Sequence, residues 1–86
     1  MAVGNLKITW SEEARADIRR LDRSTAMRIF NGVYSFTLTG QGDVKTLSGK
    51  YAGQLRLRLG DYRVIFTADG EILHVLNVKH RREAYR

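Results

Sequence analysis

The second half of this 86-residue chain alternates apolar and polar residues around two short breaks. The segments 54–59 (QLRLRL) and 62–68 (YRVIFTA) alternate almost strictly, and 71–79 (EILHVLNVK) is almost continuously apolar. Alternation is typical of strands with one buried face, and a continuous apolar run is typical of a central strand. The dipeptides at 60–61 (Gly-Asp) and 69–70 (Asp-Gly) are both two-residue hairpin signals. The pattern therefore predicts a three-stranded antiparallel meander.

The first turn predicts which side chains of this meander face the core, because directly opposed residues share a face of a sheet. A two-residue turn at 60–61 pairs Leu59 with Tyr62 and Arg58 with Arg63. One face then carries only apolar and aromatic side chains, ready to pack against helices: Leu55, Leu57, Leu59, Tyr62, Val64 and Phe66.

The other face is predicted to be mixed. Counting through a two-residue turn at 69–70 places Ile65 opposite His74 and Arg63 opposite Leu76. An arginine cluster would then lie beside apolar side chains that need a cover, and the members of this face would be Arg56, Arg58, Arg63, Ile65, Ile72, His74 and Leu76. Clustered arginines repel one another unless an anion sits there, although exposed arginines with extended side chains are the simpler alternative.

The first half reads as a short strand followed by two helices. Residues 6–10 alternate, and Ser11 is a predicted N-cap followed by two glutamates. Apolar residues then recur at helical spacing in two segments, which turn near residues 22–24 and end at Gly40 and Gly42. These apolar residues are Ala14, Ile18, Leu21, Ala26, Ile29, Phe30, Val33 and Phe36. The element order predicts an α+β fold, and 86 residues make one domain, 1–86.

Composition narrows the class of protein. The net charge is +6 and uneven: residues 1–43 hold six basic and five acidic side chains, and residues 44–86 hold nine and four. Such a basic excess favours a polyanionic partner, either nucleic acid or an acidic protein, although a solubilising surface has the same composition. The absence of cysteine excludes disulfides and a thiol nucleophile, and two histidines are too few for a zinc site. No segment is typical of a signal peptide or a membrane span, so we expect a cytoplasmic protein.

The last nine residues, VKHRREAYR, carry the groups that could act on a polyanion. His80 can exchange a proton near neutral pH, and Arg81 can donate two hydrogen bonds to a phosphate. Tyr85 offers a ring to an unstacked base and a hydroxyl to a phosphate or ribose. We expect this tail to fold back over the arginine face as a short turn or helix, which gives a set suited to RNA cleavage without a metal or cofactor.

Two segments, LSGKYAGQLRLRLGDYRVIF and VLNVKHRREAYR, resemble the RelE/ParE toxin superfamily of bacterial type II toxin–antitoxin systems, and specifically its RelE-type mRNA interferases. The resemblance extends over nearly the whole chain and is strongest in GDYR and in the HRR-x-x-Y ending. It implies two helices on an antiparallel sheet of about four strands. It also implies an enzyme that cuts mRNA in the ribosomal A site beside ribosomal RNA. A cognate antitoxin would neutralise it and would be its only link to operator DNA.

The family chemistry implied by this resemblance is attack of the ribose 2′-OH on the adjacent phosphorus. Arg56 and Arg58 stand where many relatives carry a basic pair, often lysine, and Arg63 of GDYR matches the phosphate clamp. Arginine does not lose its proton in proteins, so this pair cannot supply the general base. The base role then passes to His80 or Tyr85 of the C-terminal group His80, Arg81 and Tyr85, with Glu83 as a third candidate.

Two alternatives come from other functional classes. A ParE-type toxin shares the fold but inhibits DNA gyrase and is no nuclease, and a degenerate toxin could act only as a co-repressor. Several other residues have simpler explanations: His74 as a structural histidine, Tyr51 as a packing residue, and Lys45 and Lys50 as loop cations able to touch ribosomal RNA. The sequence does not define the codon preference.

Overall fold

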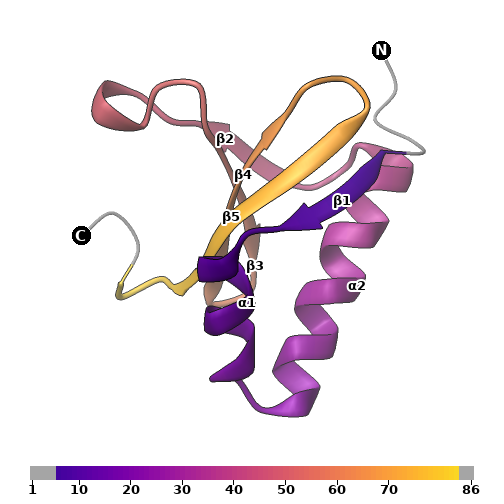
Figure 1. Ribbon diagram of the computed structural model, residues 1–86, viewed down its shortest axis with the longest axis vertical. Coiled ribbons are helices and arrows are strands. Elements are labelled where there is room, and N and C mark those ends of the chain that lie inside the picture. Colours follow the sequence, from indigo (N-terminus) through magenta and orange to yellow (C-terminus); the bar gives the residue numbers. More distant parts are fainter. Residues whose placement is uncertain (1–5, 84–86) are drawn as a thin grey trace.

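The computed structural model describes residues 6–83, which form one five-stranded sheet with two helices (Figure 1). The helices are α1 (Glu12–Arg19) and α2 (Arg23–Thr39). The strands lie in the order β1-β5-β4-β3-β2, with β1 parallel to β5 and all other pairs antiparallel. Their bounds are β1 (Lys7–Trp10), β2 (Asp43–Thr46), β3 (Leu55–Leu59), β4 (Tyr62–Ala68) and β5 (Ile72–His80), with a 3₁₀ turn η1 (Gly49–Tyr51) between β2 and β3.

The α+β class and the element order predicted from the sequence are confirmed, but the strand count is not. The sequence predicts about four strands, and the fifth is β2, which pairs with β3 at the edge of the sheet. Its four residues, DVKT, contain a single apolar side chain, so they give no alternation to detect. β5 lies between β1 and β4, as its continuous apolar run predicts.

α1 begins and α2 ends where the sequence indicates, whereas α1 ends at Arg19, before Leu21 of its predicted apolar stripe. The Ser11 hydroxyl accepts a hydrogen bond from the Ala14 N–H at 3.0 Å, and the Asp22 carboxylate accepts one from the Thr25 N–H at 3.1 Å. These side chains satisfy backbone donors that the first helical turn leaves unpaired. At the other end of α2, Gly40 takes the left-handed conformation with φ of 71°, and its N–H donates to the Phe36 carbonyl.

The core lies between α2 and one face of β3, β4 and β5. The predicted register of β3 and β4 is confirmed, with Leu57 opposite Val64 and Leu59 opposite Tyr62. Leu57, Val64 and Phe66 are buried, and the Phe66 ring packs edge-on against Phe36 of α2 at 5.6 Å. The predicted apolar face of the hairpin is therefore the face that carries the core.

The predicted register of β4 and β5 is wrong. Asp69 accepts hydrogen bonds from the N–H groups of Glu71 and Ile72, so the turn is longer than two residues and Ala68 pairs with Leu73. A bulge beside Ile65 and Phe66 then shifts the register by one more residue. Ile65 lies opposite Asn77 and Arg63 opposite Lys79, instead of His74 and Leu76. The bulge reverses which face each later residue of β5 occupies.

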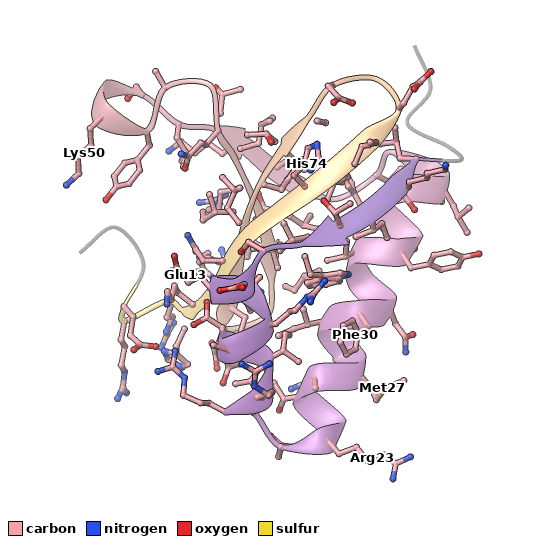
Figure 2. The ribbon with its side chains drawn as sticks, in the orientation of Figure 1. Glu13, Arg23, Met27, Phe30, Lys50 and His74 are labelled. Carbon is pink, nitrogen blue, oxygen red and sulfur yellow. The ribbon has the colours of Figure 1, made fainter. Side chains whose placement is uncertain are left out.

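The exposed apolar surface consequently lies elsewhere than the sequence predicts. Ile65, expected in an open patch beside the arginines, is buried with 7% of its surface accessible. Phe30, predicted to lie in the core stripe of α2, is partly exposed and contacts the Trp10 ring edge-on at 5.0 Å. Among residues 6–83, the exposed large apolar side chains all belong to α2: Met27, Phe30, Tyr34 and Leu38. Figure 2 labels Met27 and Phe30.

Candidate functional site at the β3–β4 turn

Three basic side chains gather around the turn between β3 and β4. The Arg63 guanidinium donates from Nη1 to the carbonyls of Gly60 and Tyr62, at 3.0 and 3.2 Å. The backbone N–H of Arg81 donates to the Asp61 carbonyl at 2.7 Å, and its Nε lies 3.8 Å from the Asp61 carboxylate. The His80 ring packs edge-on against the Tyr62 ring at 5.4 Å. Strand, turn and C-terminal segment therefore meet at one end of the sheet.

The segment after β5 is held there by its own turn. Residues 81–83 form a turn in which the Glu83 N–H donates to the His80 carbonyl at 2.7 Å. A C-terminal turn is what the sequence predicts, and the structure seats it against Asp61 at the sheet end. Tyr85, the last of the predicted site residues, lies outside the described residues.

The predicted arginine face exists, and one carboxylate serves two of its three members. Arg58 lies directly opposite Arg63 on β4 and opposite Asp43 on β2. Asp43 is 3.2 Å from the Arg56 guanidinium and 3.9 Å from that of Arg58. The Arg56 side chain is only 17% exposed, whereas that of Arg58 is 51% exposed. Arg58 and Arg63 are thus the pair that an incoming anion can reach, and Arg56 supports them from the β2 side.

His80 does not share this face. It pairs with Tyr62, whose neighbours Val64 and Phe66 point into the core, so its ring lies on the side of the sheet opposite Arg63. Its Nδ1 accepts a hydrogen bond from the Arg82 N–H at 3.2 Å. In a neutral imidazole this places the proton on Nε2, and the ring then presents a donor. Neither nitrogen of such a neutral ring is free to accept a proton, so the arrangement does not suit a general base.

Lys79 is the residue of β5 that shares the arginine face at this end of the sheet, in place of the predicted Leu76. It lies opposite Arg63, and its ammonium is 2.8 Å from Asp17 Oδ1 and 3.2 Å from Glu13 Oε2. Figure 2 shows Glu13 on the first turn of α1, beside β5. The hydrogen bond to Asp17 raises the pKa of Lys79 above its usual 10.5, against the opposing effect of burial. Lys79 therefore stays protonated beside Arg63, with its charge balanced by Asp17 and Glu13.

Sequence reasoning missed both Lys79 and its main partner, Asp17. Asp17 is 3% exposed, and its carboxylate also accepts from the Val78 N–H at 2.9 Å and from Arg20 at 2.6 Å. The only signal in the sequence is that Glu13 and Asp17 stand four residues apart, on one face of a helix. This spacing shows a shared face and gives no indication of what the face contacts.

Three further observations complete the survey of residues 6–83. The Nδ1 of His74 lies 2.7 Å from the Thr9 hydroxyl, and its Nε2 lies 3.6 Å from the Asp69 carboxylate. No three acidic or histidine side chains in this range come close enough together to hold a metal ion. Neither of the two helices has the length and apolar character needed to cross a membrane.

Comparison with known proteins identifies the family. Residues 8–85 match the model of the ParE toxin of the type II toxin–antitoxin system parDE. The sequence matches none of the curated proteins with which it was compared.

Solved structures share the fold at low sequence identity. The RelBE2 toxin–antitoxin complex of Mycobacterium tuberculosis has a chain with a TM-score of 0.82 at 20% identity, over 93% of this chain and 95% of that chain. The archaeal RelE–RelB complex of Pyrococcus horikoshii gives 0.74 at 22% identity, over 93% and 99%. The YoeB/ParE toxin of Agrobacterium tumefaciens gives 0.70 at 20% identity, over 87% and 98%. Because the family model spans nearly the whole chain, this protein belongs to the ParE toxin family, within the RelE/ParE superfamily of type II toxin–antitoxin toxins.

Proposed function

We propose that this toxin is a metal-independent endoribonuclease that cleaves mRNA in the ribosomal A site. The observation that supports this is the meeting of Arg58, Arg63 and Arg81 with the only histidine of the C-terminal segment around one turn. A phosphorane formed by internal attack carries extra negative charge, which fixed cations stabilise.

The chemistry we propose follows the placement of these groups. The 2′-oxygen attacks phosphorus while the bond from phosphorus to the 5′-oxygen breaks, which gives a 2′,3′-cyclic phosphate and a free 5′-hydroxyl. Arg58 and Arg63 contact the phosphate oxygens, and the ion-paired Arg56 and Lys79 flank them on either side. The leaving 5′-oxygen needs a proton, and we assign its delivery to the imidazolium form of His80, acting at the end of the sheet where the two faces meet, because a neutral imidazole is not a useful acid.

The proton of the 2′-OH must leave to a base. Lys79 is held protonated by Asp17, and arginines stay charged, so no cation of the arginine face fills that role. We assign it to Tyr85, by the resemblance of the HRR-x-x-Y ending to that of the mRNA interferases. Arg81 is anchored on Asp61 at the sheet end, which supports a role for the C-terminal segment there.

A cognate antitoxin is the proposed partner in the cytoplasm. The similar structures include toxin–antitoxin complexes, which supports this assignment. The exposed apolar side chains of α2 form the surface best suited to it, and α2 contains Arg23 and Arg28 with no acidic residue. An amphipathic antitoxin helix with acidic flanks would complement this surface. Contact with operator DNA would come through the antitoxin alone.

The matched family favours one specific alternative, inhibition of DNA gyrase without nuclease activity, because the model that matches is that of ParE. A primer-extension assay on mRNA in a translating extract, run beside a gyrase supercoiling assay, separates the two functions. Cleavage without loss of supercoiling supports the proposal, and the reverse result establishes the alternative. A toxin inactive in both assays, but able to strengthen antitoxin binding to operator DNA, would be a degenerate co-repressor.

A further inference from the structure

The connection between β2 and β3 borders an open, basic cavity at the protein surface, apart from the β3–β4 turn. It measures about 280 Å³ and is lined by Lys45, Thr46, Leu47, Ser48, Tyr51 and Arg56. The Leu47 N–H donates to the Gln54 carbonyl at 3.0 Å, which closes the loop at its base. The η1 turn is held by the Tyr51 N–H, which donates to the Ser48 carbonyl at 3.2 Å. The cavity walls are thus fixed by backbone hydrogen bonds.

The charges around this cavity point to an anionic ligand. Its lining contains two cations and three hydroxyl groups and no carboxylate. Lys45 lies directly opposite Arg56 across the β2–β3 pair, an arrangement of like charges that destabilises a sheet. Within residues 6–83, Lys45 makes no ion pair. Arg56 contacts the Asp43 carboxylate at 3.2 Å through one terminal nitrogen, and its buried Nε has no hydrogen-bond acceptor. A phosphate in the cavity would accept from Lys45 and share the Arg56 guanidinium with Asp43.

The cavity also has an aromatic wall. The Tyr51 ring forms part of the lining, and the Lys50 ammonium lies 5.2 Å from the ring centroid. Figure 2 shows Lys50 at the η1 turn, which projects from the sheet away from both helices. An aromatic face next to several cations is the combination by which proteins bind single-stranded nucleic acid, because the ring stacks on a base and the cations hold its phosphate.

We propose that this cavity is a subsite for one nucleotide of single-stranded RNA, with the base against Tyr51 and the phosphate on Lys45 and Arg56. The inference rests on the proposed function, because it adds a neighbouring nucleotide to the substrate cut at the β3–β4 turn. Arg56 and Arg58 stand two residues apart on the same face of β3, roughly 7 Å along the strand. The subsite therefore adjoins the proposed site of cleavage. An acidic peptide would use the same cations but would have no need of the ring.

The test measures RNA binding without cleavage. The full chain is titrated against a fluorescein-labelled, 2′-O-methylated oligoribonucleotide, which cannot be cut, and anisotropy gives the affinity. Tyr51→Leu is expected to weaken binding about tenfold, whereas Tyr51→Phe keeps the ring and stays within about twofold. Lys45→Glu should weaken binding at least about tenfold and flatten the salt dependence. Lys7→Glu, the same charge change on β1 at the far edge of the sheet, is the matched control.

Several outcomes would overturn the subsite. One is unchanged RNA affinity in Tyr51→Leu, and another is a Lys7→Glu effect as large as that of Lys45→Glu. Binding of poly-glutamate at the cavity, with RNA affinity insensitive to Tyr51, would make it a protein-docking site instead. A second readout avoids dependence on folding of the variants: adenosine monophosphate should shift the amide NMR signals of residues 45–51 in the unaltered chain. RNA binding at Tyr51 without any mRNA cleavage would refute the proposed function and leave the subsite standing.

Discussion

The carboxylate of Asp17 accepts a hydrogen bond from the backbone N–H of Val78 at 2.9 Å. β1 ends at Trp10, which pairs with Val75, so no strand borders the second half of β5 on that side. The start of α1 fills the gap: the Ser11 hydroxyl donates to the Leu76 carbonyl, and Asp17 then takes the Val78 N–H. One buried helical carboxylate thus continues the hydrogen bonding of a strand edge, and it also holds Lys79 beside Arg63.

Replacing Asp17 should therefore destabilise the whole fold. In Asp17→Ala the Val78 N–H loses its acceptor in a buried position, and Lys79 loses its closest partner. We predict a loss of about 2–4 kcal/mol in the free energy of unfolding, measured by urea denaturation followed by circular dichroism. Glu13→Ala is the control, because Glu13 contacts the same lysine from an exposed position, and it should cost less than about 1 kcal/mol. Equal losses in the two variants would contradict the role assigned to Asp17.

The contact between Asp17 and Lys79 also predicts that stability depends on pH in the alkaline range. Asp17 raises the folded-state pKa of Lys79 above the 10.5 expected for an unfolded chain. The contribution of the Asp17–Lys79 contact to the free energy of unfolding is then complete below about pH 10.5, and it is lost as the pH rises through the folded-state pKa of Lys79. Lys79→Arg keeps its charge in that range, so it controls for the titration of other groups. Thermal melts above about pH 10.5 should show the unaltered chain losing more stability than Lys79→Arg, and parallel losses would exclude the linkage.

How much of this molecule the sequence predicts depends on how far apart the interacting residues are. The cap at Ser11 and the pairing of Arg58 with Arg63 depend on a few neighbouring residues, and the sequence predicts them correctly. The pairing of β5 depends on how the Asp69 side chain lengthens a turn and on a bulge, neither of which has a clear local signal.

The bulge matters for the site because it decides which residue of β5 shares a face with Arg63. Counting without it would put His74 and Leu76 on the arginine face and leave Lys79 off it. With it, Lys79 lies on that face, and His80 lies on the side of Tyr62. The residue types of the candidate site were thus readable from the sequence, but their distribution over the two faces was not.

Arg63 is the residue whose replacement best tests the proposed chemistry. Arg63→Ala should remove about 2–4 kcal/mol of transition-state stabilisation, which lowers the rate of mRNA cleavage roughly 30- to 1,000-fold in primer extension. Stability should fall by no more than about 1 kcal/mol, because its bonds to Gly60 and Tyr62 are partly exposed and its repulsion with Arg58 is relieved. Arg82→Ala removes the same charge from an exposed turn and should keep cleavage within about threefold. A large loss of stability in Arg63→Ala would show that the residue is structural.

The antitoxin surface gives the last prediction. An arginine face beside open apolar side chains would suit an acidic antitoxin segment, but Ile65 on that face is buried. The accessible apolar side chains lie on α2, where Tyr34 is 59% exposed and Met27 47% exposed. We therefore expect Tyr34→Glu and Met27→Glu each to weaken the antitoxin complex by more than about tenfold, because each buries a charge in an apolar contact.

Hydrogen exchange on the complex locates this contact directly. Amides of α2 should gain protection when the antitoxin binds, and Arg28→Glu should weaken the complex most at low salt, because an acidic partner is then repelled. Lys7→Glu, at the far edge of the sheet, should leave the affinity unchanged. Protection confined to β3 and β4 would place the antitoxin on the arginine face after all. It would then act by occupying the candidate site, whereas a helix on α2 would act by blocking entry into the ribosome.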